Sequence, residues 1–347
     1  MDGALAGIDR DAVEPWIGAE VPELVSPFRW TQLVGGHSNL TYRIDDTMGT
    51  TAVVRRPPLG ELQPKAHDMN REYRIISALW GTGVPVARPH AFCADAAVTG
   101  APFYVMGFAP GRPLGAAGET ETWLVEDARG DASQSFADTL AALHVVDPIE
   151  RGLGDLGRHD DYAGRQLKAW YRSWVTSAPD AGLDDPRAHA LHDVLQEHKP
   201  PDGPVRVVHG DFAIHNNLVA DDGHITAVLD WEVASLGEPM ADLAYLLNSW
   251  VMASEAADRG PAITALPGFW TRDQLVARYA EVAGGIDEAK LRYFVVLNHW
   301  RSACIVHGVY TRYKRGQKSS EGVDLQRFID GADRSLALAE RAQRLMR

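Results

Sequence analysis

Short segments in the first third of the chain alternate between apolar and polar residues. Such a period-2 pattern, bounded by turn residues, predicts β-strands. Between the third and fourth segments, residues 69–79 instead place Tyr73, Ile76 and Leu79 on one face, which predicts a helix. A helix is also expected at residues 8–21, and strands at residues 28–34, 40–45, 51–56, 88–93 and 103–108.

The run Ala-Pro-Gly-Arg-Pro at residues 109–113 is the clearest break in the pattern. Beyond it, apolar residues recur at helical spacing, and Thr271 with Gln274 forms a capping box that starts a helix. We therefore expect an N-terminal lobe over residues 1–108 and a C-terminal lobe over residues 109–347. The other helices are expected at residues 133–146, 162–176, 189–198, 291–313 and 325–345.

Three strand-like runs, at residues 205–208, 217–220 and 225–229, interrupt these helices and carry polar loops. Asp211 follows the first run, Asn216 lies five residues later, and Asp230 ends the third run. An amide oxygen and a carboxylate suit Mg²⁺ better than zinc. Asp211 is then free to accept a proton from a hydroxyl group. Each residue alone is more often a turn residue, but the combination favours a catalytic site.

The run His209-Gly210-Asp211, with Asn216 and then Leu229-Asp230-Trp231-Glu232, resembles the active site of the aminoglycoside phosphotransferase family, which is related to protein kinases. The resemblance implies an α+β, two-lobed protein-kinase-like fold with a small β-rich N-lobe and a mainly helical C-lobe. Residues 35–42 and 308–317 are most similar to the kinase-like part of acyl-CoA dehydrogenase fusion proteins.

The same resemblance implies a role for each matching residue. Asp211 would be the catalytic base, Asn216 and Asp230 would hold Mg²⁺, and ATP would be the phosphoryl donor. Asp242 resembles the aspartate that braces the catalytic loop. The nucleotide would lie under a glycine turn, beside an arginine–glutamate pair and along a hinge strand, which together comprise Gly35, Gly36, Ser38, Asn39, Arg55, Glu72, Met106 and Phe108.

Two positions depart from the pattern of the family. Arg55 stands where protein kinases have lysine, and arginine binds phosphate with a different geometry. Ala213 stands where relatives usually have a basic residue or histidine, and His215 is a candidate replacement. Basic residues at 314, 315 and 318 are typical of a solvated helix end, or of a clamp for an anionic substrate that residues 299–301 would complete.

Charge and cysteine content narrow the class of protein. The 34 Lys and Arg against 47 Asp and Glu give a net charge of -13, which disfavours nucleic-acid and membrane-surface partners. The two cysteines, Cys93 and Cys304, form no disulfide framework. No basic, apolar leader begins the sequence. A cytoplasmic protein is expected.

The sequence predicts a kinase that phosphorylates a hydroxyl group of a small molecule, with a hydroxylated acyl-CoA or similar anionic metabolite preferred. An aminoglycoside or macrolide antibiotic is the alternative acceptor. A catalytically weak, nucleotide-binding pseudokinase is a third hypothesis, which Ala213 favours and the joint presence of Asp211, Asn216 and Asp230 opposes. The choice between ATP and GTP, the acceptor and the oligomeric state stay open.

Overall fold

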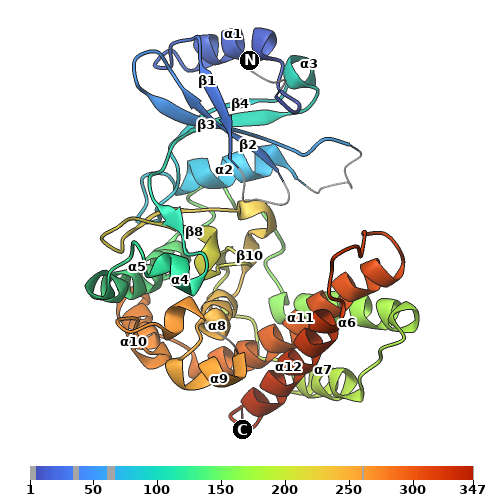
Figure 1. Cartoon of the computed structure of the whole chain (residues 1–347). Coiled ribbons are helices and arrows are strands. Elements are labelled where there is room, and N and C mark those ends of the chain that lie inside the picture. The colour runs from blue at the N-terminus through green and yellow to red at the C-terminus, as the bar shows by residue number, and fades with distance from the viewer. Residues whose placement is uncertain (1–4, 34–38, 61–66, 260–261, 347) are drawn as a thin grey trace.

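A computed structural model describes residues 5–33, 39–60, 67–259 and 262–346, and it has two lobes (Figure 1). The upper lobe holds a five-stranded antiparallel sheet with strand order β1-β2-β3-β5-β4. The predicted strands and the helix at residues 69–79 are confirmed. The elements of this lobe are α1 (Arg10–Glu20), β1 (Arg29–Gln32), β2 (Leu40–Asp45), β3 (Thr51–Arg56), α2 (Met69–Leu79), β4 (Pro89–Cys93), α3 (Ala96–Thr99) and β5 (Phe103–Gly107).

The hairpin of β2 and β3 shows how the period-2 pattern sets the two faces of the sheet. Tyr42, Ile44 and Val54 point to one face, where they are buried in a core with residues of α1. Arg55 pairs with Thr41 in register and therefore points to the opposite face. The side chain of Arg55 reaches α2 on that face, at the side of the sheet turned toward the helical lobe.

The helical lobe consists of two groups of helices (Figure 1). Helices α5, α8, α9 and α10 lie below the sheet, and α6, α7, α11 and α12 lie to one side. The predicted helices are present, and the Thr271 capping box begins α10. The helices of this lobe are α4 (Ala117–Thr120), α5 (Glu126–Val145), α6 (Tyr162–Ala181), α7 (Pro186–Glu197), α8 (Pro239–Ser249), α9 (Ala256–Arg259), α10 (Arg272–Ala283), α11 (Glu288–Lys314) and α12 (Gln326–Gln343).

Two small sheets lie between the lobes and carry the polar loops. One has the strand order β6-β8-β9 and the other pairs β10 with β7. The three predicted runs are confirmed as β7, β8 and β9, whereas β10, whose sequence Ser-Leu-Gly has a single large apolar residue, was not predicted. The strands are β6 (Arg112–Pro113), β7 (Arg206–Val208), β8 (Asn217–Val219), β9 (Ile225–Val228) and β10 (Ser235–Gly237).

Among the helices that the structure describes, none is both long and apolar enough to cross a membrane. The division of the chain at residue 108 stays a prediction. The segment from β5 to β6 nevertheless runs from the sheet into the small sheets, at the level where the predicted break lies.

Candidate active site

The loop after β7 is held from below by a buried carboxylate. Asp242 of α8 is 1% exposed, and its two oxygens accept hydrogen bonds from the backbone N–H groups of His209 (2.5 Å) and Gly210 (2.9 Å). Gly210 has φ +79°, and a Cβ there would lie 3.2 Å from the carbonyl oxygen of Val233, so the turn favours glycine. Asp242 therefore fixes the backbone immediately before Asp211.

The side chain of Asn216 holds Asp211 itself. Its amide nitrogen donates to the Asp211 backbone oxygen (2.9 Å) and to Oδ2 of the Asp211 carboxylate (3.0 Å). Tyr245, on α8, lies near the same carboxylate. Burial raises the pKa of Tyr245, and the negative charge of Asp211 adds to the effect, so Tyr245 keeps its proton. The Asp211 carboxylate is thereby oriented by Asn216, with a neutral phenol close by.

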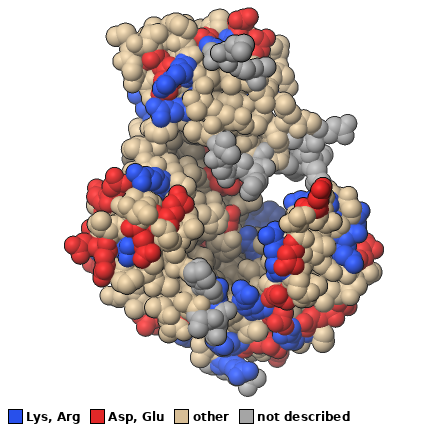
Figure 2. All heavy atoms as spheres, viewed as in Figure 1, with Lys and Arg blue, Asp and Glu red and all other residues tan. Residues whose placement is uncertain are grey.

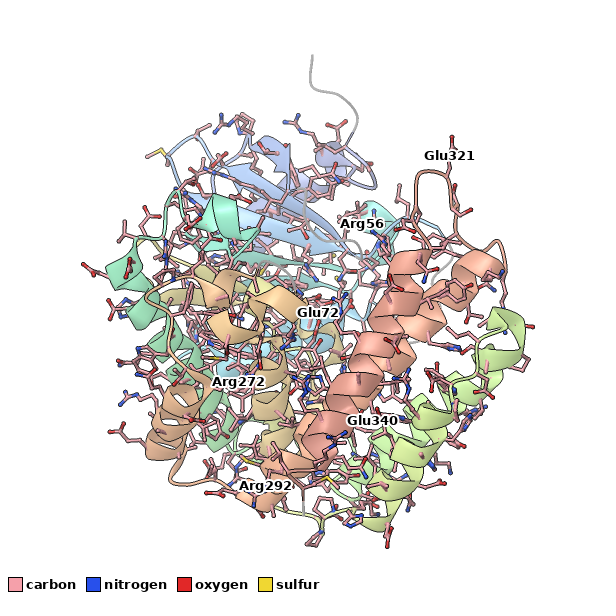
Figure 3. All side chains as sticks on the ribbon, turned by 60° about the horizontal axis from the view of Figure 1, so that its bottom comes forward. Arg56, Glu72, Arg272, Arg292, Glu321 and Glu340 are labelled. Atoms are coloured by element: carbon pink, nitrogen blue, oxygen red, sulfur yellow. The ribbon has the colours of Figure 1, made fainter. Side chains whose placement is uncertain are left out.

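On the sheet side, a buried glutamate organises three donors. Glu72 accepts hydrogen bonds from Nε of Arg55 (3.0 Å), Nδ2 of Asn39 (3.1 Å) and the hydroxyl of Tyr104 (3.1 Å). In Figure 3 Glu72 lies between the sheet and the C-terminal helices, whereas Glu321 points outward from the α11–α12 connection. The guanidinium of Arg55 also reaches Oδ1 of Asp230 (3.2 Å), and so joins the two lobes.

Asn216 and Asp230 are brought together by the pairing of β8 with β9. The backbone N–H of Leu229 donates to the carbonyl oxygen of Asn216 (2.8 Å), and Asp230 follows directly with a left-handed φ of 64°. The amide nitrogen of Asn216 is occupied by Asp211, which leaves its side-chain oxygen for a cation. An amide oxygen and a carboxylate fit Mg²⁺, which retains several waters and ligand phosphates.

Within the described ranges, no group of three or more His, Cys, Asp or Glu side chains could enclose a metal ion. A Mg²⁺ ion held by Asn216 and Asp230 would need its other oxygens from water and from a ligand. Glu232 lies close to the site. Its burial raises its pKa, and the charges of Asp230 and Glu72 add to the shift. A bound cation would offset the negative charges of Asp230, Glu72 and Glu232.

The predicted nucleotide-contacting residues divide into three sets. Gly35, Gly36 and Ser38 lie outside the described residues. Arg55, Glu72 and Asn39 form one hydrogen-bonded cluster, although Asn39 supports Glu72 through its side chain. Met106 pairs with Val53 and Pro89 in the sheet, and Phe108, which is 38% exposed, follows β5. Their contact with adenine stays a prediction.

Several contacts of the site were missed from the sequence. Tyr245 lies three residues after Asp242 on α8, so helical spacing could have placed both side chains near the same loop. The position of His144, whose Nε2 is 3.5 Å from Asp242, left no such signal. His215 is exposed, and Ala213 is 3% exposed. The cation that contacts the loop is Arg301, whose Nη2 donates to the Gly210 carbonyl oxygen (3.0 Å).

The other residues of the proposed anion clamp have different surroundings. The indole of Trp300 is buried and donates to the carbonyl oxygen of Ala188. His299 lies near Arg259 and Arg272, and burial, together with their charges, lowers its pKa to about 3. Arg315 is paired with Asp180 at the surface. Of residues 299–301, Arg301 is the one that the structure brings to the catalytic loop.

Comparison with known proteins assigns the family. The model of the phosphotransferase enzyme family matches residues 29–284, which include both sides of the site. The chain belongs to this family. Its fold is that of the protein-kinase-like phosphotransferases. A putative aminoglycoside phosphotransferase from Ralstonia eutropha JMP134 has a TM-score of 0.81 and 29% identity, and the match covers 97% of this chain and 98% of that one.

Curated relatives carry a different name. Acyl-CoA dehydrogenase family member 11 from Gallus gallus is 33% identical over 84% of this phosphotransferase-family chain, and the Mus musculus protein is 33% identical over 90%. The chain spans about two fifths of these proteins, 37% and 41% of their lengths. A macrolide 2'-phosphotransferase from Brachybacterium faecium, at 19% identity and a TM-score of 0.59, shares the fold.

Proposed function

We propose that the protein transfers the γ-phosphoryl group of ATP, with Mg²⁺, to a hydroxyl group of a small molecule. The observation that carries the proposal is the continuous arrangement of Asp211, Asn216, Asp230 and Arg55. Asn216 hydrogen-bonds Asp211 and directly precedes β8, which pairs with β9, the strand before Asp230. Asp230 forms an ion pair with Arg55. A proton acceptor, two oxygen ligands and a phosphate-binding cation thus follow one another across the space between the lobes.

The chain's own residues then act mainly by positioning. Asp211 accepts the proton of the acceptor hydroxyl. At the same time the hydroxyl oxygen forms a bond to the γ-phosphorus of ATP, and the bond from the γ-phosphorus to the oxygen that leaves with ADP breaks. Asn216 holds the Asp211 carboxylate in place for this transfer. Arg55, fixed by Glu72, binds phosphate oxygens of the donor. Mg²⁺, when bound by Asn216 and Asp230, would neutralise negative charge on the phosphate groups.

A hydroxylated acyl-CoA, or a similar anionic metabolite, is the acceptor class we favour. The support is the similarity to proteins named for acyl-CoA chemistry, together with basic side chains on the wall of the central hollow (Figure 2). Aminoglycosides are polycations, and such a wall would repel them. A protein of the same fold, at 17% identity and a TM-score of 0.58, was crystallised with ADP and hygromycin B, so the antibiotic alternative is included in the test below.

Calorimetric titration of ATP and GTP, with Mg²⁺ and then with EDTA, tests the donor site. We expect Mg²⁺-dependent binding that Asp230→Asn weakens, because the carboxylate ligand is lost; a metal-independent effect would contradict the assignment of Asp230. Phosphate transfer from the bound nucleotide is then measured with hydroxyacyl-CoAs, hydroxy acids and aminoglycosides. Asp211→Ala should abolish transfer and leave nucleotide binding near the wild-type level. Absence of binding for both nucleotides would favour a scaffold without activity.

A further inference from the structure

Arg301 of α11 lies directly beside the catalytic loop. Its Nη2 donates to the carbonyl oxygen of Gly210, the residue before Asp211 (3.0 Å). The guanidinium carbon lies 5.4 Å from the ring centroid of Trp170, on α6, and 5.2 Å from that of Tyr245, on α8. Tyr245 also lies near the Asp211 carboxylate. The guanidinium and the proposed proton acceptor therefore share this tyrosine as a neighbour.

The guanidinium has unused hydrogen-bonding capacity. Its Nε is buried and has no hydrogen-bond partner. Its bond to Gly210 uses Nη2, and in the part of the chain that the structure describes Nη1 makes no hydrogen bond and no carboxylate lies within 4.0 Å of the group. Arg55 differs, since it pairs with both Glu72 and Asp230. Arg301 therefore forms no ion pair with any described side chain.

The surroundings of Arg301 indicate what could neutralise it. Figure 2 shows Lys and Arg side chains gathered in the central hollow on the side of α6 and α11, although the chain as a whole has a net charge of -13. A local positive surface on an acidic protein attracts anions selectively. A guanidinium held between aromatic rings offers paired N–H donors that match the oxygens of a carboxylate or phosphate.

We propose that Arg301 binds an oxyanion of the phosphate acceptor, a carboxylate or a phosphate carried close to the hydroxyl that is phosphorylated. The inference rests on the proposed function and names the residue that selects the acceptor. The contact with Gly210 would place the bound anion next to the loop that carries Asp211. Trp170 and Tyr245 hold the guanidinium in place for this contact.

The test compares acceptors that share one hydroxyacyl group and differ in charge. The free hydroxy acid offers a carboxylate, its coenzyme A thioester offers phosphates, and its N-acetylcysteamine thioester is neutral. Arg301→Gln removes the charge and keeps a donor for Gly210, and Arg301→Lys keeps the charge. Arg172→Gln is the control, because Arg172 is exposed on α6 and has no carboxylate partner among the described residues. Mg²⁺–ATP affinity and thermal unfolding are measured for every variant.

We expect Arg301→Gln to lower kcat/KM for the anionic acceptor about 10- to 100-fold, the range for a charge-assisted hydrogen bond. Transfer to the neutral thioester and Mg²⁺–ATP affinity should change less than about twofold, as should every activity of Arg172→Gln. Arg301→Lys should recover part of the loss. A loss of kcat/KM with the free acid would identify the oxyanion as a carboxylate, and a loss with the coenzyme A thioester would identify it as a phosphate.

Three results would overturn the role of Arg301. The first is an equal loss for neutral and anionic acceptors, which would mean that Arg301 supports the loop or the transferring phosphoryl group. The second is that the wild-type protein phosphorylates only the neutral acceptors. The third is that the wild-type protein binds Mg²⁺–ATP but neither binds nor phosphorylates any of the anionic acceptors. Failure to bind nucleotide would instead refute the proposed function itself.

Discussion

Asp242→Asn should destabilise the protein strongly, because Asp242 is buried beneath the loop that carries Asp211. The wild-type carboxylate accepts from the backbone N–H groups of His209 and Gly210. Asparagine can accept one of these bonds, but its amino group must face the other N–H donor. Each bond to a buried charged acceptor contributes about 1.5–3 kcal/mol, and a buried unsatisfied donor costs a further 1–3 kcal/mol or so. We expect a loss of about 3–5 kcal/mol in the free energy of unfolding.

Urea unfolding, followed by circular dichroism and tryptophan fluorescence, measures this loss. The control is Asp193→Asn, since the Asp193 side chain is 80% exposed and its removal should change the free energy by less than about 0.5 kcal/mol. Phosphate transfer by Asp242→Asn should fall with stability, because the loop before Asp211 loses its support. A loss below about 1 kcal/mol at pH 7 would refute the assignment of Asp242 as the brace of this loop.

The pH dependence gives an independent check. Burial by itself would raise the pKa of Asp242, but its interactions with His144 and His209 and the hydrogen bond from the Gly210 N–H outweigh burial and lower the pKa. A lowered pKa contributes stability that is fully present above the unfolded value of about 3.9 and is lost as pH falls through the folded value. The difference between wild type and Asp242→Asn should therefore shrink as the pH falls below about 5. A difference that grows as the pH falls from about 5 to 3 would contradict this reasoning.

Two further substitutions test other parts of the site. Glu72→Gln should cost about 2–4 kcal/mol in unfolding free energy and weaken nucleotide binding, because Arg55 loses its buried carboxylate partner and one of the donors around residue 72 then faces an amino group. Urea unfolding measures the stability and calorimetric titration measures the nucleotide affinity. Unchanged nucleotide binding would contradict the role of Arg55. Tyr245→Phe removes the hydroxyl that lies near Asp211 and should lower kcat by up to about tenfold. In steady-state assays an altered KM for ATP would place Tyr245 on the nucleotide side instead.

Local pattern predicted most of the elements because it reports on neighbours in the chain. The alternation in residues 40–45 and 51–56 identified β2 and β3 with their bounds, and the spacing of Tyr73, Ile76 and Leu79 identified α2. The start of α5 was placed at residue 133, whereas the helix begins at Glu126. Its first turns are rich in acidic residues and include Gly130, so they lack the apolar spacing on which the prediction depended.

Contacts across the chain could not be predicted in the same way. Periodicity indicates which face of a helix is buried, but it does not indicate what lies against that face. Arg301 is 91 residues from Gly210, and His144 is 98 residues from Asp242, so their contacts depend on how the helices pack. The position of Asp242 was predicted only through resemblance to a family, which carries such long-range information.

The substitution at residue 213 illustrates how the chain can place charge around its catalytic loop. Ala213 is 3% exposed, and its N–H donates to the backbone oxygen of Asp211, so the residue serves the shape of the loop. Positive charge approaches instead from β3, through Arg55, and from α11, through Arg301. Because these cations belong to different lobes, a substitution on α11 can alter acceptor binding without disturbing the Arg55–Glu72 pair. We therefore infer that donor and acceptor recognition can change independently in this chain, as the contrast between Arg301→Gln and Glu72→Gln would show.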